Sequence, residues 1–371
     1  MDIQIKQLAT TVIEHSITLQ KGEKVYIDYK GSGADEFISE LINQIYEHGG
    51  IPFLHTISAE LLNEILKNSC EEQLKIMRDS ALFQMKQMDC YISVRAYNNN
   101  SALSDVPVEK LNMYTKLFIQ PVHLKERVNN TKWVVLEYPT PGFAQIAKMS
   151  LPKFKEYYFN ACTLNYSKLR AAMESLVNLM NKTDKVHIIG SNVNLTFSIK
   201  DIPTVPCYGI RNLPDGEIYT APVKDSINGF INYNTPSIFN GHTFENIKFT
   251  FLNGKIIEAE ANNSKLLNKI LDTDEGARYI GEFSLGVNPF ISTPVMSTLF
   301  DEKISGSFHL TPGACYKKAP NGNDSAIHWD LVLIQTKEYG GGDIYFDKVL
   351  IRKDGLFVLP ELECLNPNNI F

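Results

Sequence analysis

Residues 24–57, KVYIDYKGSGADEFISELINQIYEHGGIPFLHTI, decide the fold class of the first half of the chain. The β-rich run at 24–29 predicts a strand. Apolar residues spaced four apart after the Gly31-Ser32-Gly33 turn predict an amphipathic helix that ends at Gly49-Gly50. Residues 51–57 predict a second strand. A strand–helix–strand unit of this kind is typical of a parallel sheet covered by helices.

The rest of the first half continues this alternation. We expect helices over residues 59–88 and 151–180, and strands over residues 90–94, 117–120 and 133–138. The chain therefore predicts an N-terminal α/β domain with a mainly parallel sheet over residues 1–184.

The pattern changes in the second half. Apolar and polar residues alternate over 193–199, as in a half-buried strand. Asn253-Gly254 and Asp354-Gly355 each separate two β-rich runs, and such dipeptides favour hairpins. A helix is expected over 265–271. Residues 185–371 therefore predict a second domain of mainly antiparallel β (α+β) structure.

Composition excludes some classes of function. The 371 residues carry 36 basic and 42 acidic side chains, a net charge of −6, so the overall balance offers no basic face for nucleic acid. No apolar run approaches the roughly 18 residues needed to cross a bilayer. The N-terminal residues lack the pattern of a secretory signal, and the six cysteines are scattered. We expect a cytoplasmic protein with no membrane partner.

The first chemical signal is residues 327–331, IHWDL. Along a strand, His328 and Asp330 would share one face, about 7 Å apart, and could converge on one metal ion. The short H-x-D pattern also occurs by chance, so a hydrogen-bonded, solvated pair is the alternative interpretation.

Three further segments carry acids and a histidine. Glu217 follows a turn in residues 212–222, and Glu282 lies between Gly281 and Phe283. Residues 299–316 contain Glu302, His309 and Tyr316. Taken singly, the acids are read more simply as solvated carboxylates or helix caps, and His309 as a core histidine. Glu282 fits that reading least, because a carboxylate among apolar neighbours is unfavourable unless it is paired.

Taken together, the segments NLPDGEIYTAP, GARYIGE, LFDEKISGSFH and SAIHWD resemble the thermophilic leucyl-aminopeptidase family, two-metal aminopeptidases without an HExxH motif. The motifs occur in this order, with 65 residues from Glu217 to Glu282, 27 more to His309 and 19 more to His328. The resemblance is strong over residues 184–360, and the α/β first half is compatible with it.

The resemblance implies a set of metal ligands and a catalytic tyrosine. The implied ligands are Glu217, Glu282, Glu302, His309, His328 and Asp330, and Tyr316 is the implied catalytic residue. The spacing between Glu302 and His309 varies within the family. The four carboxylates carry −4, which balances two divalent cations, and these ligand types suit zinc, cobalt or manganese.

The resemblance further implies a metal-dependent aminopeptidase. Two metal ions would activate a water for attack on the N-terminal peptide bond of short peptides with a free N-terminus. Tyr316 would stabilise the oxyanion, and either Glu217 or Glu282 would carry the proton to the leaving amine. The family also implies a homodimer.

Two other functions compete with this one. Relatives of the family include a mononuclear iron(II) ring-cleaving dioxygenase, and His309, His328 and Asp330 would supply its two histidines and one carboxylate. Such a site has no use for Glu217 and Glu282 as ligands, which favours the peptidase. The third possibility is a non-catalytic peptide-binding protein on the same scaffold.

Overall fold

In the computed structural model, which describes residues 2–99 and 101–370, the chain forms two compact units. The first unit runs to Thr163 and also includes Gly209–Pro214; the second comprises Leu164–Tyr208 and the residues from Asp215 onward. The extents differ from the expected stretches 1–184 and 185–371, because helix α9 (Tyr166–Met180) belongs to the second unit.

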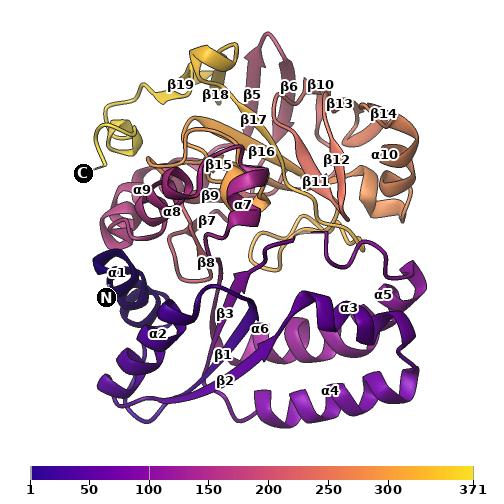
Figure 1. Cartoon of the computed structure of the whole chain (residues 1–371). Coiled ribbons are helices and arrows are strands. Elements are labelled where there is room, and N and C mark those ends of the chain that lie inside the picture. The colour runs from indigo at the N-terminus through magenta and orange to yellow at the C-terminus, as the bar shows by residue number, and fades with distance from the viewer. Residues whose placement is uncertain (1, 100, 371) are drawn as a thin grey trace. The chain divides into compact units, whose positions relative to one another are not determined.

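The first unit is built on a parallel sheet of five strands (Figure 1). Its order is β2-β1-β3-β4-β8, and every neighbouring pair is parallel. The strands are β1 (Lys24–Gly31), β2 (Ile51–Ile57), β3 (Cys90–Ala96), β4 (Lys132–Glu137) and β8 (Asn212–Leu213). Successive parallel strands require crossovers, and helices supply them. The expected parallel α/β sheet is confirmed.

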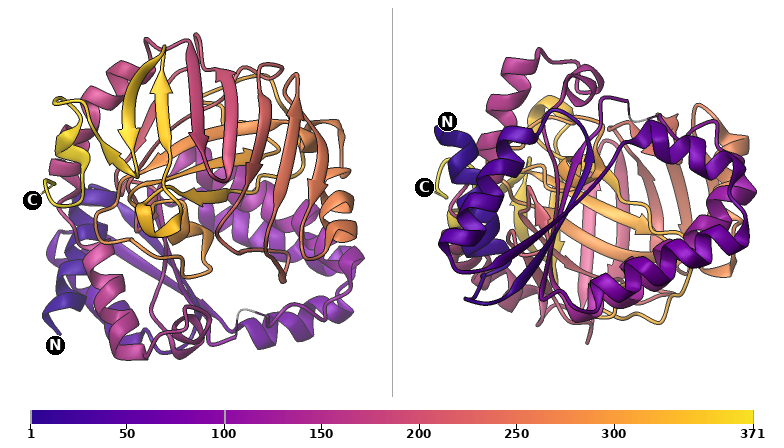
Figure 2. Two further views of the ribbon diagram at one scale, coloured as in Figure 1. Left: turned by 90° about the horizontal axis from the view of Figure 1, so that it is seen from above. Right: turned by 60° about the horizontal axis from the view of Figure 1, so that its bottom comes forward.

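Helices lie on both sides of this sheet, with α1 and α2 on one side and α4 on the other (Figures 1 and 2). In α2, the spacing of Phe37, Leu41 and Ile45 puts all three on one buried face. The helical segments of this unit are α1 (Ile3–Thr10), η1 (Thr11–Ser16), α2 (Asp35–Glu47), α3 (Ala59–Asn68), α4 (Glu71–Met85), α5 (Val108–Tyr114), η2 (Thr115–Arg127), α6 (Val128–Asn130), α7 (Pro141–Ile146) and α8 (Leu151–Cys162).

One expected strand is wrong. Residues 117–120 lie within the helical segment η2, not in the sheet. A short apolar run cannot distinguish a strand from a buried helical turn. Phe118 and Val122, four residues apart, share a helical face and pack with Met85 and Tyr91. Contact with α4 therefore decides the conformation of this segment.

The second unit contains an antiparallel sheet of eight strands, whose strands lie side by side in Figure 2. Its order is β14-β13-β10-β6-β5-β18-β19-β20. The strands are β5 (Lys185–Gly190), β6 (Val193–Ser198), β10 (Asn228–Asn232), β13 (Lys248–Leu252), β14 (Lys255–Glu260), β18 (Asp343–Phe346), β19 (Val349–Lys353) and β20 (Leu356–Phe357). Both expected hairpins are present: Asn253 and Gly254 have φ of 48° and 78°, as a tight hairpin turn requires.

A second, five-stranded sheet of order β17-β16-β15-β9-β7 packs against the first. Its strands are β7 (Val205–Cys207), β9 (Glu217–Thr220), β15 (Ile280–Gly286), β16 (Ser307–Pro312) and β17 (Leu331–Ile334). The rings of Phe197 on β6 and Phe283 on β15 meet edge to face with centroids 5.0 Å apart, so the core of this unit lies between the two sheets. The expected antiparallel sheets are confirmed.

The remaining segments of the second unit are the 15-residue helix α9 and several shorter elements. They are α9, β11 (Ser237–Phe239), β12 (His242–Phe244), α10 (Ser264–Leu271), η3 (Glu275–Arg278), α11 (Thr298–Asp301), η4 (Lys337–Tyr339) and η5 (Glu363–Leu365). Among the described residues, no helix combines the length and apolar character needed to span a membrane.

Candidate metal centre

The candidate site lies on one face of the antiparallel five-stranded sheet of the second unit, β17-β16-β15-β9-β7. Successive side chains of a strand alternate between its two faces, so Glu282 and Ser284 on β15 point to the same side. The register pairs Ser284 with His309 and Glu282 with Thr311 on β16, and sets Glu217 of β9 beside Gly286. The acids and the histidine therefore share one face. Phe283, between the two polar residues of β15, turns to the core instead.

A β-bulge adjusts this face at Glu282. The register between β15 and β16 shifts between Ile280 and Glu282, at Gly281. A Cβ atom on Gly281 would lie 2.3 Å from the carbonyl oxygen of Ala314, so only glycine fits this close approach. This close approach explains why the residue before Glu282 is a glycine.

His328 and Asp330 precede strand β17 and do not lie within it, contrary to the expected strand over this stretch. His328 forms an isolated bridge with Gly313. Side chains still alternate between the two faces along this stretch. Trp329 is buried on one side, and His328 Nε2 lies 3.4 Å from Asp330 Oδ1 on the other. The two side chains do share a face, as the sequence predicts.

Five of the six predicted ligands form two overlapping groups. Donor atoms of Glu217, Glu282 and His309 lie within 4.8 Å of one another, and so do those of Glu282, His328 and Asp330. Glu282 belongs to both groups: its Oε1 lies 3.4 Å from His309 Nε2, and its Oε2 lies 3.3 Å from His328 Nε2. Its carboxylate therefore stands between the two imidazoles.

The two imidazoles are held in a strongly anionic setting. Burial by itself would lower the pKa of His309, but its contact with Glu282 and the charge of Glu217 raise the pKa to about 9. His328 donates from Nδ1 to the carbonyl of Ala314 at 2.8 Å, which leaves Nε2 facing Glu282 and Asp330. Nδ1 of His309 and Nε2 of His328 are buried and form no hydrogen bond.

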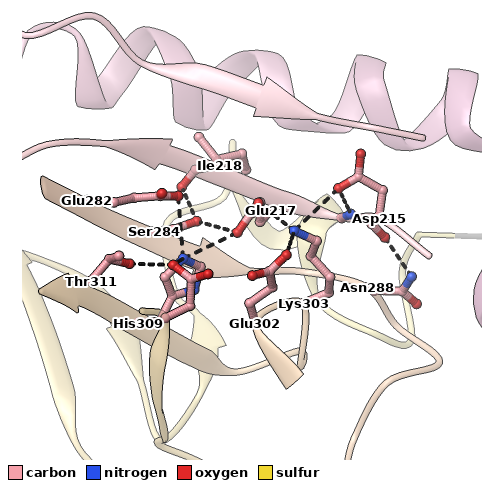
Figure 3. A network of polar contacts seen from close by, with 12 residues as sticks. Asp215, Glu217, Ile218, Glu282, Ser284, Asn288, Glu302, Lys303, His309 and Thr311 are labelled. Carbon is pink, nitrogen blue, oxygen red and sulfur yellow. Dashed lines mark hydrogen bonds and ion pairs between the residues drawn. The ribbon is translucent and has the colours of Figure 1, made fainter. Parts of the chain in front are cut away.

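The sixth predicted ligand, Glu302, lies against a lysine. Lys303 is fully buried, and its ammonium donates to Glu302 Oε1 and, at 2.5 Å, to Glu217 Oε1 (Figure 3). Asp215 Oδ1 lies 3.7 Å from the same nitrogen. Burial alone would lower the pKa of Lys303, but these carboxylates raise it well above its usual value. Glu302 is in none of the candidate donor groups formed by the described residues.

Two hydroxyl groups orient the carboxylates. Ser284 Oγ donates to Glu217 Oε2 at 3.0 Å, and Thr311 Oγ1 donates to Asp330 Oδ1 at 2.5 Å. Ser284 stands on the same sheet face as Glu217 (Figure 3), and the register places Thr311 opposite Glu282 on that face. Hydrogen bonds of this kind fix the direction in which a carboxylate presents its free oxygen.

Tyr316 stands at the edge of the site. Its ring centroid is 4.5 Å from that of His328 and 5.4 Å from that of Tyr219, and 47% of its surface is exposed. Loss of water around the phenol and the nearby carboxylates, Glu282 first, raise its pKa well above the usual value. The hydroxyl therefore stays protonated at neutral pH and can donate a hydrogen bond.

The donor set fits divalent cations. The site holds one ammonium, Lys303, and five carboxylates: Asp215, Glu217, Glu282, Glu302 and Asp330. Their summed charge is −4 when the carboxylates are ionised and the imidazoles are neutral. Buried carboxylates at this density are unfavourable without counter-charge. His309 Nε2 and His328 Nε2 both lie beside carboxylate oxygens, and imidazole nitrogens with carboxylate oxygens are the ligands that zinc, cobalt and manganese accept.

Sequence reasoning missed four residues of this site: Asp215, Ser284, Lys303 and Thr311. Asp215 lies two positions before Glu217 within the same motif, and Ser284 and Thr311 lie two positions after Glu282 and His309. The period of two along a strand was therefore a usable signal for the hydroxyls. Nothing in the sequence marks Lys303 as buried, because a lysine after a glutamate is ordinarily solvated.

A buried cluster of carboxylates and imidazoles on one sheet face is the donor set of a metalloprotein. The chain belongs to the thermophilic metalloprotease (M29) family, whose sequence model matches residues 1–357. Two curated relatives are similar over nearly the whole of both chains. Aminopeptidase 2 of Geobacillus stearothermophilus is 22% identical, covering 95% of each chain. Aminopeptidase T of Thermus thermophilus is 24% identical, covering 92% of this chain and 95% of its own.

Two solved structures share the fold. Wild-type AmpT from Thermus thermophilus superposes with a TM-score of 0.82 at 21% identity, covering 96% of this chain and 99% of its own. The 2,5-dihydroxypyridine dioxygenase of Pseudomonas putida KT2440 gives 0.60 at 11% identity, covering 97% and 98%. The same architecture therefore occurs in two enzymes with different names, and the side chains of the site must distinguish between their reactions.

Proposed function

We propose that this chain is a metal-dependent aminopeptidase that removes the N-terminal residue from short peptides with two divalent cations. The position of Glu282 carries the proposal, because its two oxygens face two different imidazoles in two donor groups. A carboxylate between two groups is suited to bridging a pair of cations. Membership of a metalloprotease family and the names of the relatives support the same activity.

The proposed ligands of one cation are Glu217, Glu282 and His309, and those of the other are Glu282, His328 and Asp330. Glu302 remains in the proposal as a ligand through the oxygen that does not bind Lys303. Zinc, cobalt and manganese all suit these donors. When bound, such a pair lowers the pKa of a water molecule and polarises the scissile carbonyl.

The chain's own residues do the remaining work. We assign to the protonated Tyr316 hydroxyl the hydrogen bond to the oxyanion that develops at the scissile carbonyl. Either Glu217 or Glu282 is the proposed carrier of the proton to the leaving amine. A free N-terminal amine would be held by the charged groups of the centre, which accounts for removal of the first residue only.

The dioxygenase alternative draws on the shared fold and on His309, His328 and Asp330. A mononuclear iron(II) site needs two histidines and one carboxylate. Here Glu217 and Glu282 lie within hydrogen-bonding or ion-pair distance of His309, which adds acids that such a site does not use. The two-cation peptidase is therefore the better-supported function.

The proposal also includes a homodimer and a cytoplasmic location. The location is supported by the six cysteines, all of which are free thiols, as expected in a reducing compartment. The dimer rests on family resemblance and is checked by the mass of the chain in solution.

A panel of peptides tests the activity directly. Short peptides with a free N-terminus and their N-acetylated counterparts are incubated with the purified chain and zinc, cobalt or manganese. We expect stepwise release of the first residue from the free peptides and none from the acetylated ones. Metal analysis should give about two cations per chain. One iron per chain, or equal cleavage of acetylated peptides, would contradict the proposal.

A further inference from the structure

We propose that the Lys303 ammonium is a built-in cation that fills an oxygen cluster otherwise able to bind a further divalent ion. Lys303 is then a specificity-determining residue that limits how many cations the centre takes. The inference builds on the proposed function, because it concerns the acidic neighbours of the proposed cation pair.

The ammonium occupies the position that a ligated cation would have. It contacts one oxygen of Glu217 and one of Glu302, with an oxygen of Asp215 at 3.7 Å (Figure 3). The whole lysine has no exposed surface. Donor atoms of Asp215, Glu217 and Cys207 lie within 4.8 Å of one another around this position. Three carboxylates thus surround a single positive charge.

The cluster differs from the two histidine-bearing groups in its chemistry. Its donors are carboxylate oxygens and the Cys207 thiol, with no imidazole. Carboxylate oxygens prefer hard cations such as Ca²⁺ and Mn²⁺, with ligand distances of about 2.0–2.6 Å. Lysine supplies one charge where a divalent ion would supply two. The ammonium binds these oxygens by directed hydrogen bonds. Because a protonated lysine is not a metal ligand, it holds the oxygens without itself binding zinc or cobalt.

Lys303 also determines which oxygens remain for the cation pair. Glu217 Oε1 is bound to the ammonium, so Oε2 is the oxygen that faces His309, at 3.5 Å. Glu302 Oε1 is likewise bound. An oxygen that accepts from the ammonium is a weaker metal ligand, so the contacts with Lys303 favour ligation by each glutamate through its other oxygen.

Replacing Lys303 by a small neutral residue tests the inference. Purified wild-type chain and the Lys303→Ser variant are dialysed against Mn²⁺, and separately against Ca²⁺, and bound metal is measured per chain. We expect the variant to bind one more cation than the wild type. We also expect Ca²⁺ to raise the thermal unfolding midpoint of the variant more than that of the wild type.

A companion variant removes one of the oxygens. Lys303→Ser combined with Asp215→Asn should bind the additional cation at least about tenfold more weakly, because a charged ligand is lost. The matched control is Lys132→Ser. Lys132 also pairs with a glutamate, Glu23, at 2.6 Å, but with one carboxylate only, so its removal should leave the metal count unchanged.

The outcomes separate the two proposals. A Lys303→Ser chain that folds only when Ca²⁺ or Mn²⁺ is present would support the inference. A variant that binds as many cations as the wild type, or that stays unfolded with either cation, would overturn it. None of these readouts requires turnover, whereas failure of the proposed function would appear as absent hydrolysis by metal-loaded wild-type chain.

Discussion

Thr311 and Asp330 face each other across the edge of the five-stranded sheet, with the threonine hydroxyl donating to the carboxylate at 2.5 Å. The contact continues the register of β16 and β17 beyond the last paired residues, Leu310 and Leu331. The strand pairing thereby sets the direction of a proposed metal ligand.

Thr311→Val should weaken metal binding while leaving the fold intact, because it removes the hydroxyl but keeps the shape of the side chain. Loss of such a supporting hydrogen bond typically lowers metal affinity about 10–100-fold. Isothermal titration with Mn²⁺ measures the change. Thr196→Val, at an exposed position of β6, is the control and should bind normally. Equal affinities in the two variants would show that Thr311 does not orient Asp330.

Tyr316→Phe should lower kcat/KM for a free dipeptide by about 10²–10³-fold, as expected when a donor to an oxyanion is lost. The number of bound cations should stay the same, since the phenol is not a proposed ligand. Tyr345→Phe, which removes a hydroxyl bonded to Asp343 on β18, provides the comparison and should keep full activity. Unchanged activity in Tyr316→Phe would exclude the proposed role of the hydroxyl.

Cation binding should release protons at neutral pH. The pKa of His309 is about 9 in the metal-free chain, so this imidazole is protonated at pH 7 and must lose its proton to become a ligand. Apparent affinity should therefore rise from pH 7 toward pH 9, by roughly tenfold per pH unit for each proton displaced. Titrations in two buffers of different ionisation enthalpy count the protons. A binding enthalpy independent of buffer would contradict this expectation.

Asp28→Asn should destabilise the first unit by about 3–5 kcal/mol, the usual effect of removing one partner from a buried ionic cluster. Asp28 is buried and accepts hydrogen bonds from Tyr91 and His55, with Lys30 Nζ at 2.9 Å. Burial alone would raise the pKa of Asp28, but Lys30 and the two hydrogen-bond donors hold it below its usual range.

The pH dependence of this contribution follows from the sign of the shift. Because the folded-state pKa is lowered, the stabilisation is present above the unfolded-state pKa of about 3.9 and is lost at lower pH. Urea unfolding at pH 7 and at pH 3 compares the variant with the wild type. Asp79→Asn, an exposed acid paired with Arg78, should change the free energy of unfolding by less than about 0.5 kcal/mol. Equal effects of the two substitutions would contradict the prediction.

Periodicity and turn chemistry predicted the two kinds of sheet, because residues 24–57 and the Asn253-Gly254 hairpin carry local signals. The segment 117–120 could not be predicted in the same way, since its helical form depends on packing against Met85 and Tyr91. Motif order predicted that Glu217, Glu282 and His309 belong together, and they do lie together. The burial of Lys303 could not be predicted, because it depends on Asp215 and Glu217, which are distant in the sequence.

The donors of the centre come from neighbouring strands, with Glu217 on β9, Glu282 on β15 and His309 on β16. A cation bound by all three residues would cross-link these strands, in addition to the backbone hydrogen bonds between them. Metal supply and resistance to heat then become one linked equilibrium: each tenfold rise in free cation above its dissociation constant adds about 1.4 kcal/mol to the folded state. Depletion of the metal would therefore both inactivate this enzyme and lower its thermal stability.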